Sequence, residues 1–225
     1  PAGPKPNGPG APAGPPPAAP PADPDPYAFC PITAGSGPGA PGGEPAPPLA
    51  LPALVGARPI GSGSLDWGFK ASFRAYVSNG NGNPPLSGLG GATIDPGGSF
   101  VFPVDGGQFV DGQGPRAVVN GEGAAVFCFP AHFFRIAMLN PTATIDGAQS
   151  RLTADIDSNL YGTEYGPWRT DVATLDSSAV EPQYSNDGQT VTWAAVPATL
   201  TAVGAAAFGG LYAAGAALDP VTVTA

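Results

Sequence analysis

Charged residues are scarce in this sequence of 225 amino acids: they make up 11% of it, and only two of them are lysines. Lys and Arg number 8 against 17 Asp and Glu, which gives a net charge of −9. A chain with this balance has no basic surface for nucleic acid or anionic lipid, so we expect neither as a partner. Polar uncharged and small residues take the place of charge, a composition typical of secreted or cell-surface proteins.

Histidine is rarer still. His132 is the single histidine, which excludes metal sites built from several imidazoles. The chain has no Gly-x-Ser-x-Gly elbow, and Asp155-x-Asp157-x-Asn159 lacks the glycine and the glutamate that complete a calcium loop. We interpret these two carboxylates as alternating residues of a strand. The sequence therefore predicts that the protein is not an enzyme.

Two cysteines, Cys30 and Cys128, are too few for a disulfide scaffold or a zinc site. In an exported protein they are expected to form one disulfide, with two free thiols as the alternative. Cys30 lies in a proline-rich N-terminal part and Cys128 in the domain that follows. The bond would therefore hold these two parts together, within one chain or between two chains.

Long hydrophobic runs are also missing. Residues 188–218 carry no charge, but they are mostly Ala, Gly and Thr, with Pro197 among them. A membrane-spanning helix needs about 20 predominantly apolar residues, so we expect no transmembrane segment here. The stretch instead predicts a buried strand followed by a helix of small residues at Thr201–Ala214.

Proline and glycine are abundant and unevenly placed. Residues 1–59 hold 20 of the 31 prolines and 10 of the 34 glycines. Proline lacks a backbone donor and glycine adds chain entropy, so this part predicts an extended arm. Two apolar segments interrupt the arm, Tyr27–Ile32 and Leu49–Val55, and both are typical of anchors that dock onto a surface. Residues 60–225 are long enough for one globular domain with a core of its own.

The domain predicts a mainly β fold. Short runs rich in Val, Phe, Thr and Ile alternate with clusters of Gly, Pro, Asn and Asp, and this pattern favours an antiparallel β-sandwich with two packed sheets. One short helix is expected at Ala71–Ser78 and a second at Thr201–Ala214. The predicted strands are Ser99–Val104, Ala124–Phe129, Arg135–Leu139, Thr142–Ile145, Arg151–Asp157, Arg169–Leu175 and Thr190–Ala195.

Three segments of the domain are the most informative about its function. The first is Gly61–Ser78, which contains Trp-Gly-Phe-Lys-Ala-Ser-Phe-Arg-Ala-Tyr. The second is Phe127–Pro141, which contains the only histidine. The third is Leu200–Thr224, where a phenylalanine and a tyrosine precede Leu-Asp-Pro. In order and approximate spacing these segments resemble the HtaA family, actinobacterial cell-surface domains that bind haem.

The resemblance covers residues 61–225 and implies a site. It implies that Tyr76 is the axial ligand of ferric haem iron, that His132 hydrogen-bonds this tyrosine, and that Tyr212 lines the pocket. Tyrosine is a known axial ligand of haem iron, and a neighbouring imidazole can orient the phenol. Arg74, two residues before Tyr76, would add positive charge or meet a propionate.

The second segment departs from the family pattern. Ala131 stands where the family has glycine, and Phe133-Phe134-Arg135 follow the histidine where the family has small polar residues. We expect Phe133 to contact haem. A haem-facing wall of Phe102, Phe133, Phe134 and Phe208 is one interpretation, and burial of these rings in the core is the other.

Two functions follow from these patterns. The first is a secreted or cell-surface protein that holds ferric haem through a tyrosine, for haem capture or relay. The alternative is a structural or assembly subunit of a surface polymer or filament, in which the arm binds neighbouring copies, with or without haem.

Overall fold

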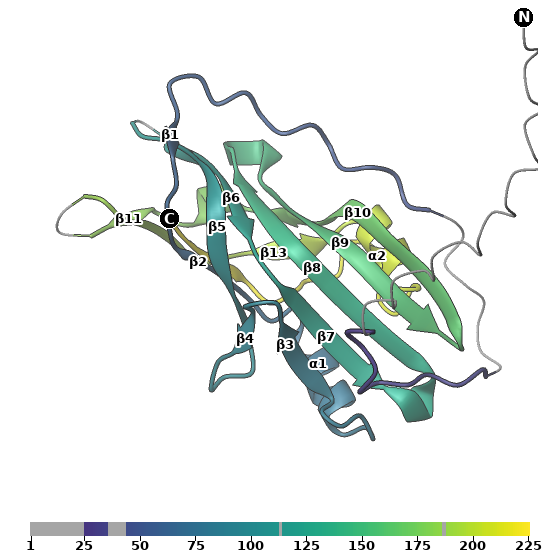
Figure 1. Ribbon diagram of the computed structural model, residues 1–225. Helices are drawn as coiled ribbons and strands as arrows, with labels where there is room; N and C mark the ends of the chain where they lie inside the picture. Colours follow the sequence, from purple (N-terminus) through teal and green to yellow (C-terminus); the bar gives the residue numbers. More distant parts are fainter. Residues whose placement is uncertain (1–24, 36–43, 113, 186–187) are drawn as a thin grey trace, which may run out of the picture.

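The structure is a computed structural model that describes residues 25–35, 44–112, 114–185 and 188–225 (Figure 1). The described residues form 14 strands of one antiparallel sheet, in the order β11-β12-β14-β2-β5-β6-β8-β9-β10-β13, with β1, β3, β4 and β7 pairing off this path. The mainly β, antiparallel fold predicted from the sequence is confirmed.

One half of the sheet contains β2 (Ser64–Trp67), β4 (Thr93–Ile94), β11 (Gln183–Tyr184), β12 (Val191–Val196) and β14 (Val221–Thr224). The other half contains β1 (Arg58–Pro59), β3 (Leu86–Leu89), β6 (Arg116–Gly121), β7 (Ala124–Phe129), β8 (Phe134–Ile145), β9 (Arg151–Leu160), β10 (Thr163–Leu175) and β13 (Ala198–Leu200). Strand β5 (Phe100–Val110) belongs to both halves.

The sandwich is one sheet folded over at β5. The first part of β5, Phe100–Pro103, pairs with β2, and the second part, from Val104 onward, pairs with β6. The register shifts between Val104 and Gly106, where the strand bends. Gly107 has a φ of 146°, and a Cβ there would collide with the carbonyl oxygen of Val118. The two predicted sheets are therefore continuous through one bent strand.

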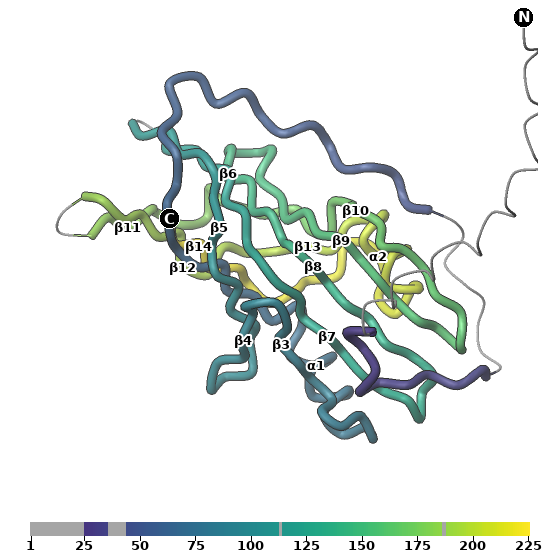
Figure 2. The backbone as a smooth tube through the Cα atoms, in the orientation of Figure 1, coloured from purple at the N-terminus to yellow at the C-terminus, as the bar shows by residue number. Residues whose placement is uncertain are grey.

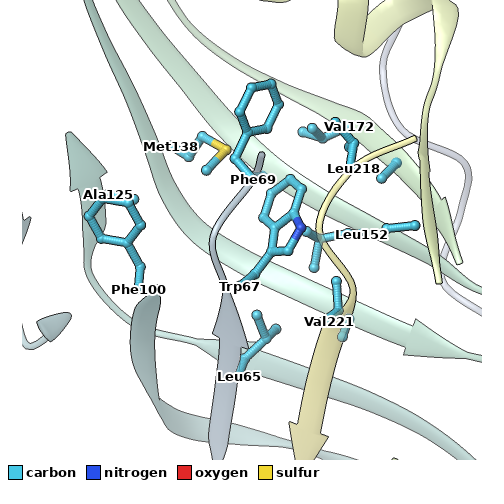
Figure 3. Packing of buried hydrophobic residues seen from close by; sticks show 14 of the residues in the cluster. Leu65, Trp67, Phe69, Phe100, Ala125, Met138, Leu152, Val172, Leu218 and Val221 are labelled. Carbon is cyan, nitrogen blue, oxygen red and sulfur yellow. The ribbon is translucent and has the colours of Figure 1, made fainter. Parts of the chain in front are cut away.

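The core lies between the two halves. Leu65 and Trp67 of β2 face Leu152 of β9 and Val172 of β10, and Phe69 lies beside Met138 of β8 (Figure 3). These side chains come from strands that are distant in the sequence, and each is at most 1% exposed. Burial of large apolar side chains drives this closure, at about 1.5–3 kcal/mol for each.

Three of the four phenylalanines considered for a haem-facing wall belong to this core: Phe102, Phe134 and Phe208. Phe102 and Phe208 are fully buried, and Phe208 stacks on Phe69 at 4.4 Å between ring centroids. The core interpretation therefore holds for these three rings. Phe134 is 4% exposed and lies directly beneath the surface that carries Tyr76.

Helix α1 (Ala71–Ser78) has the predicted limits. Phe73 and Val77 are buried at i and i+4 spacing, which leaves Tyr76 on the exposed side. Lys70 occupies the N-cap position without a side-chain cap. The Asp219 side chain, far along the chain, accepts a hydrogen bond from the Ala71 amide at 2.9 Å and so caps the N-terminus of the helix.

Helix α2 (Ala202–Ala207) is shorter than predicted. Thr201 caps its start by accepting a hydrogen bond from the Gly204 amide at 2.8 Å. Gly209 and Gly210 then have φ values of 65° and 71°, a left-handed conformation that ends the helix. In the described part of the chain, no helix has the length and apolar character to cross a bilayer.

Two predicted strands, Arg135–Leu139 and Thr142–Ile145, form the single strand β8. Asn140 has a φ of 47°, and the register with β9 shifts between Leu139 and Thr142. The strand therefore continues through a β-bulge at the Asn-Pro pair, where the sequence predicted a break between two strands.

The described parts of the arm lie on the same chain's own sheet (Figure 2). Tyr27 packs against Ala124, Val126 and Ala137, and the guanidinium of Arg135 lies 3.8 Å from the centre of its ring. Burial, followed by the Asp157 carboxylate, raises the pKa of Tyr27 to about 12, so the phenol is protonated at neutral pH. This anchor was predicted; its docking surface is the outer face of β7 and β8.

The second arm segment is held by its backbone. Arg151 donates to the carbonyls of Leu49 and Ala50 at 3.1 and 2.8 Å, and the Leu49 amide donates to Asp171 at 2.9 Å. The apolar side chains behave differently, since Leu54 is buried while Leu49 is 67% exposed and Leu51 is 58% exposed. The remaining arm residues, 1–24 and 36–43, lie outside the described part.

A disulfide joins Cys30 to Cys128 within the one chain. Cys128 is fully buried on β7, and Cys30 follows the docked Tyr27 segment. The bond spans 98 residues of sequence and fastens the arm next to Phe129, which is part of the site described below.

Candidate functional site

Tyr76 and His132 meet on the surface of the domain. Tyr76 lies in the last turn of α1, and His132 ends the single-turn 3₁₀ helix η1 (Pro130–His132) between β7 and β8. The Tyr76 hydroxyl and the His132 Nδ1 share a hydrogen bond, although 56 residues separate them. The Tyr76 side chain is 41% exposed, so this pair is open to an incoming ligand.

Aromatic rings hold the pair in place. The His132 imidazole stacks on Phe129 at 4.2 Å and 13° between planes. The Tyr76 ring lies 5.0 Å from Phe129 and is nearly parallel to Phe134 at 6.4 Å. The Ala131 amide donates to Asn81 at 2.8 Å, which fixes the η1 turn. The orientation of both polar groups is therefore set by packing before any ligand arrives.

Tyr212 borders the same surface from the C-terminal segment. Its ring makes edge contacts with Phe69 and Phe73 at 6.2 and 6.1 Å, and Phe73 in turn lies 6.4 Å from Tyr76. The structure thus brings Tyr76, His132 and Tyr212, predicted from three separate segments, to one region.

Tyr161 is a residue that the sequence reasoning missed. It lies in the turn between β9 and β10 with a φ of 56°, and its amide donates to the Phe133 carbonyl at 2.7 Å. Its hydroxyl is close enough to Tyr76 to influence that group's ionisation. A tyrosine before glycine in a hairpin carries no signal for binding in the sequence alone.

The pKa of Tyr76 lies above its ordinary value. Partial burial is the main cause, and unfavourable interactions with Tyr161 and Tyr212 add to it. The free protein therefore presents a neutral phenol at physiological pH. A metal that binds this oxygen must displace the proton, and His132 Nδ1 is the atom beside it.

Arg74, which the sequence predicted to add positive charge to the site or meet a propionate, has protein partners in the structure. It forms a salt bridge with Asp219 and donates to the Gly68 carbonyl at 2.7 Å, on another side of α1 from Tyr76. A Cβ at position 68 would collide with the Arg74 guanidinium, so this packing requires glycine. The Trp67 indole donates to the Asp219 carbonyl at 3.0 Å. Arg74 thus ties the first and third segments together.

Phe133 lies on the arm side of the site. It has a left-handed φ of 56°, and its ring lies 6.1 Å from that of Tyr161. Gly35 of the arm is so near that an added Cβ would come within 2.7 Å of the Phe133 ring. Contact between Phe133 and haem stays a prediction.

Other parts of the molecule offer different chemistry. The acidic pair on β9 forms ion pairs, Asp155 with Arg169 at 3.1 Å and Asp157 with Arg135 at 2.8 Å. Among the described residues, no cluster of three or more His, Cys, Asp or Glu side chains could hold a metal ion. A cavity of about 670 Å³ is lined by residues that include Arg116, Tyr184 and Trp193. Strand β11, which contains Tyr184, lies away from α1 (Figure 1).

Comparisons with known proteins identify the family and the fold. The model of the HtaA family, described as Htaa, matches residues 62–224. The C-terminal domain of HtaA from Corynebacterium glutamicum has a TM-score of 0.62 at 26% identity, covering 74% of this chain and 96% of that one. A domain-swapped dimer of a histidine-to-alanine variant of that domain has a TM-score of 0.55 at 26% identity, covering 69% and 90%.

The haem-binding protein HtaB from the same organism has a TM-score of 0.53 at 20% identity, covering 75% of this chain and 95% of that one. At this identity the likeness shows the fold alone. Among curated proteins, none is similar enough to count as a relative. Since the family match covers nearly the whole domain that holds the three segments, the chain belongs to the HtaA family.

Proposed function

We propose that this protein binds ferric haem on the cell surface or in secreted form, with Tyr76 as the axial ligand, and that it serves haem capture. Membership of the HtaA family supports haem as the ligand. The observation that carries the proposal is the hydrogen bond between Tyr76 and His132 on an exposed, ring-lined surface.

The residues present fit ferric haem. A phenolate is a hard anionic donor that suits Fe(III), and tyrosine is an established axial ligand type. Tyr76 is 41% exposed, which lets a flat ligand approach it, and Phe129 and Phe134 provide apolar contact beside its ring. When haem is bound, it supplies the iron that is to be captured. The protein binds and orients it and moves one proton from Tyr76 Oη toward His132.

The direct test is a titration of the full chain with ferric haem, followed by absorption and resonance Raman spectroscopy. The proposal expects a Soret band together with the charge-transfer and vibrational features of tyrosinate bound to Fe(III). Titration without a saturable spectral change, or saturation with only histidine-type features, would overturn it.

The affinity for ferric haem is expected to fall as the pH falls. The pKa of Tyr76 is raised, so the free site is a neutral phenol and iron competes with its proton. One displaced proton weakens binding by up to about tenfold for each pH unit lowered. Titrations between pH 6 and 9, with far-UV circular dichroism to confirm folding, measure this slope. A flat profile would mean that no proton is released to solvent on binding, as when His132 keeps the proton of Tyr76.

Replacing His132 with alanine is expected to lower the ferric haem affinity about 10- to 100-fold, as loss of a group that orients a metal ligand does. The tyrosinate features should remain, because Tyr76 keeps its contacts with Phe129 and Phe134. Since a histidine-to-alanine variant of a related domain is a domain-swapped dimer, light scattering must first establish the oligomeric state. A monomeric variant with wild-type affinity would exclude this role for His132.

Assembly through the arm remains the alternative proposal. The described arm residues make their contacts with the same chain's sheet. The exposed side chains of Leu49, Leu51 and Val55 are the feature that favours assembly, because they present apolar surface to solvent.

A further inference from the structure

Lys70 differs from nearly every other cation in the described part of the chain. Five arginines each form an ion pair with a carboxylate: Arg74, Arg116, Arg135, Arg151 and Arg169. Arg58 has no carboxylate within salt-bridge distance among the described residues, and it lies over the Phe109 ring at 4.7 Å. Lys70 likewise has no carboxylate partner among the described residues, and it is the unpaired cation that borders the Tyr76 site.

The Lys70 ammonium is held at the edge of this site. Its Nζ donates to the Ala217 carbonyl at 2.7 Å and lies 5.5 Å from the centre of the Tyr212 ring. Tyr212 contacts Phe73 at 6.1 Å, and Phe73 lies 6.4 Å from Tyr76. An unbroken row of rings therefore leads from the ammonium to Tyr76. Along α1 the two residues are six apart, a rise of about 9 Å.

Two of the ammonium's donors remain available. An ammonium has three N–H groups, and Ala217 accepts from one of them. Asp219 is near in sequence to Ala217, but its carboxylate is already committed to Arg74 and to the Ala71 amide. The contact with Ala217 thus fixes the position of the Lys70 ammonium, and no carboxylate of the described residues pairs with it.

We propose that Lys70 binds a propionate carboxylate of the haem, an inference that rests on the function proposed above. The whole chain carries a net charge of −9, so it repels an anionic ligand at long range. A cation at the site's edge offsets that repulsion and determines which edge of the porphyrin faces Tyr212. Arg74, the residue expected for this role from the sequence, is occupied by Asp219.

The test compares ferric protoporphyrin IX with its dimethyl ester, which lacks the carboxylate charge. In Lys70→Met the affinity for the diacid is expected to fall about fivefold to thirtyfold, because a charged hydrogen bond is lost. The affinity for the ester should not change, and Lys70→Arg should retain preference for the diacid. Arg58→Gln is the matched control, because Arg58 has no carboxylate partner among the described residues and its strand β1 lies far from α1 (Figure 1).

Other results overturn the inference in distinguishable ways. If Lys70→Met weakens the diacid and the ester equally, Lys70 only holds the loop at Ala217. If it changes neither affinity, Lys70 has no part in binding. In both cases tyrosinate features in the wild-type spectrum leave the proposed function standing. If the wild-type protein shows no tyrosinate features with either porphyrin, the proposed function fails and the role of Lys70 with it.

Discussion

Replacing Tyr76 with phenylalanine should abolish the tyrosinate spectrum of the ferric haem complex and lower the haem affinity by at least about 100-fold. The change removes one oxygen atom, the proposed iron ligand, and leaves the ring in contact with Phe129 and Phe134. Because this side chain is 41% exposed, the fold should tolerate the loss of a hydroxyl. The affinity loss exceeds that expected for His132, since a ligand atom contributes more than the group that orients it.

Tyr161→Phe is the matched control for this experiment. It removes the same atom from a neighbouring tyrosine in the β9–β10 turn, which influences the ionisation of Tyr76. The tyrosinate features should survive in this variant. If they persist in Tyr76→Phe and vanish in Tyr161→Phe, the iron ligand is Tyr161 and the assignment of Tyr76 is wrong. Resonance Raman spectra of both variants, recorded at equal haem occupancy, decide between them.

Removing the disulfide should destabilise the folded protein by about 2–4 kcal/mol, the typical contribution of a bridge that closes a long loop. The bond between Cys30 and Cys128 closes a separation of 98 residues, and it holds the Tyr27 segment on β7. In Cys30→Ala/Cys128→Ala the unfolded chain gains freedom, and the arm loses its covalent attachment. Urea unfolding followed by tryptophan fluorescence measures the change, because Trp67 and Trp193 are buried.

Reduction of the wild-type protein serves as the control. A dithiol reductant should shift the urea midpoint in the same direction as the double substitution, and it should leave the double variant unchanged. Equal midpoints for the oxidised wild-type protein and the double variant would mean that the noncovalent contacts of Tyr27 hold the arm by themselves.

Local patterns were sufficient for several elements. The short helix predicted at Ala71–Ser78 has those limits in the structure. The alternating runs predicted the antiparallel strands, and three ordered segments indicated the family. The resemblance also named Tyr76, His132 and Tyr212, which the structure brings to one region. These inferences depend on spacing along one segment or on a pattern shared with relatives.

The partners of charged and polar groups came only from the tertiary structure. Arg74 is two residues from Tyr76 in sequence, yet it pairs with Asp219 across 145 residues. In the described part of the chain Lys70 has no carboxylate partner, because the Asp219 carboxylate is bound to Arg74 and to the Ala71 amide. Tyr161 reaches the site through a hairpin turn that has no binding signature. Ion pairs of this kind form where the folded chain places opposite charges, which local propensity does not encode.

The sequence by itself therefore indicated an acidic, mainly β member of the HtaA family, with a short helix at Ala71–Ser78 that contains Tyr76 and with a proline-rich N-terminal part. The tertiary structure decided how the single sheet folds over at β5, where the arm docks, and which cations are free to meet a ligand. The physical reason is the separation in sequence between the interacting residues. Helix and strand patterns arise between neighbours in sequence, whereas sheet closure and charge pairing arise between residues that only the complete fold brings together.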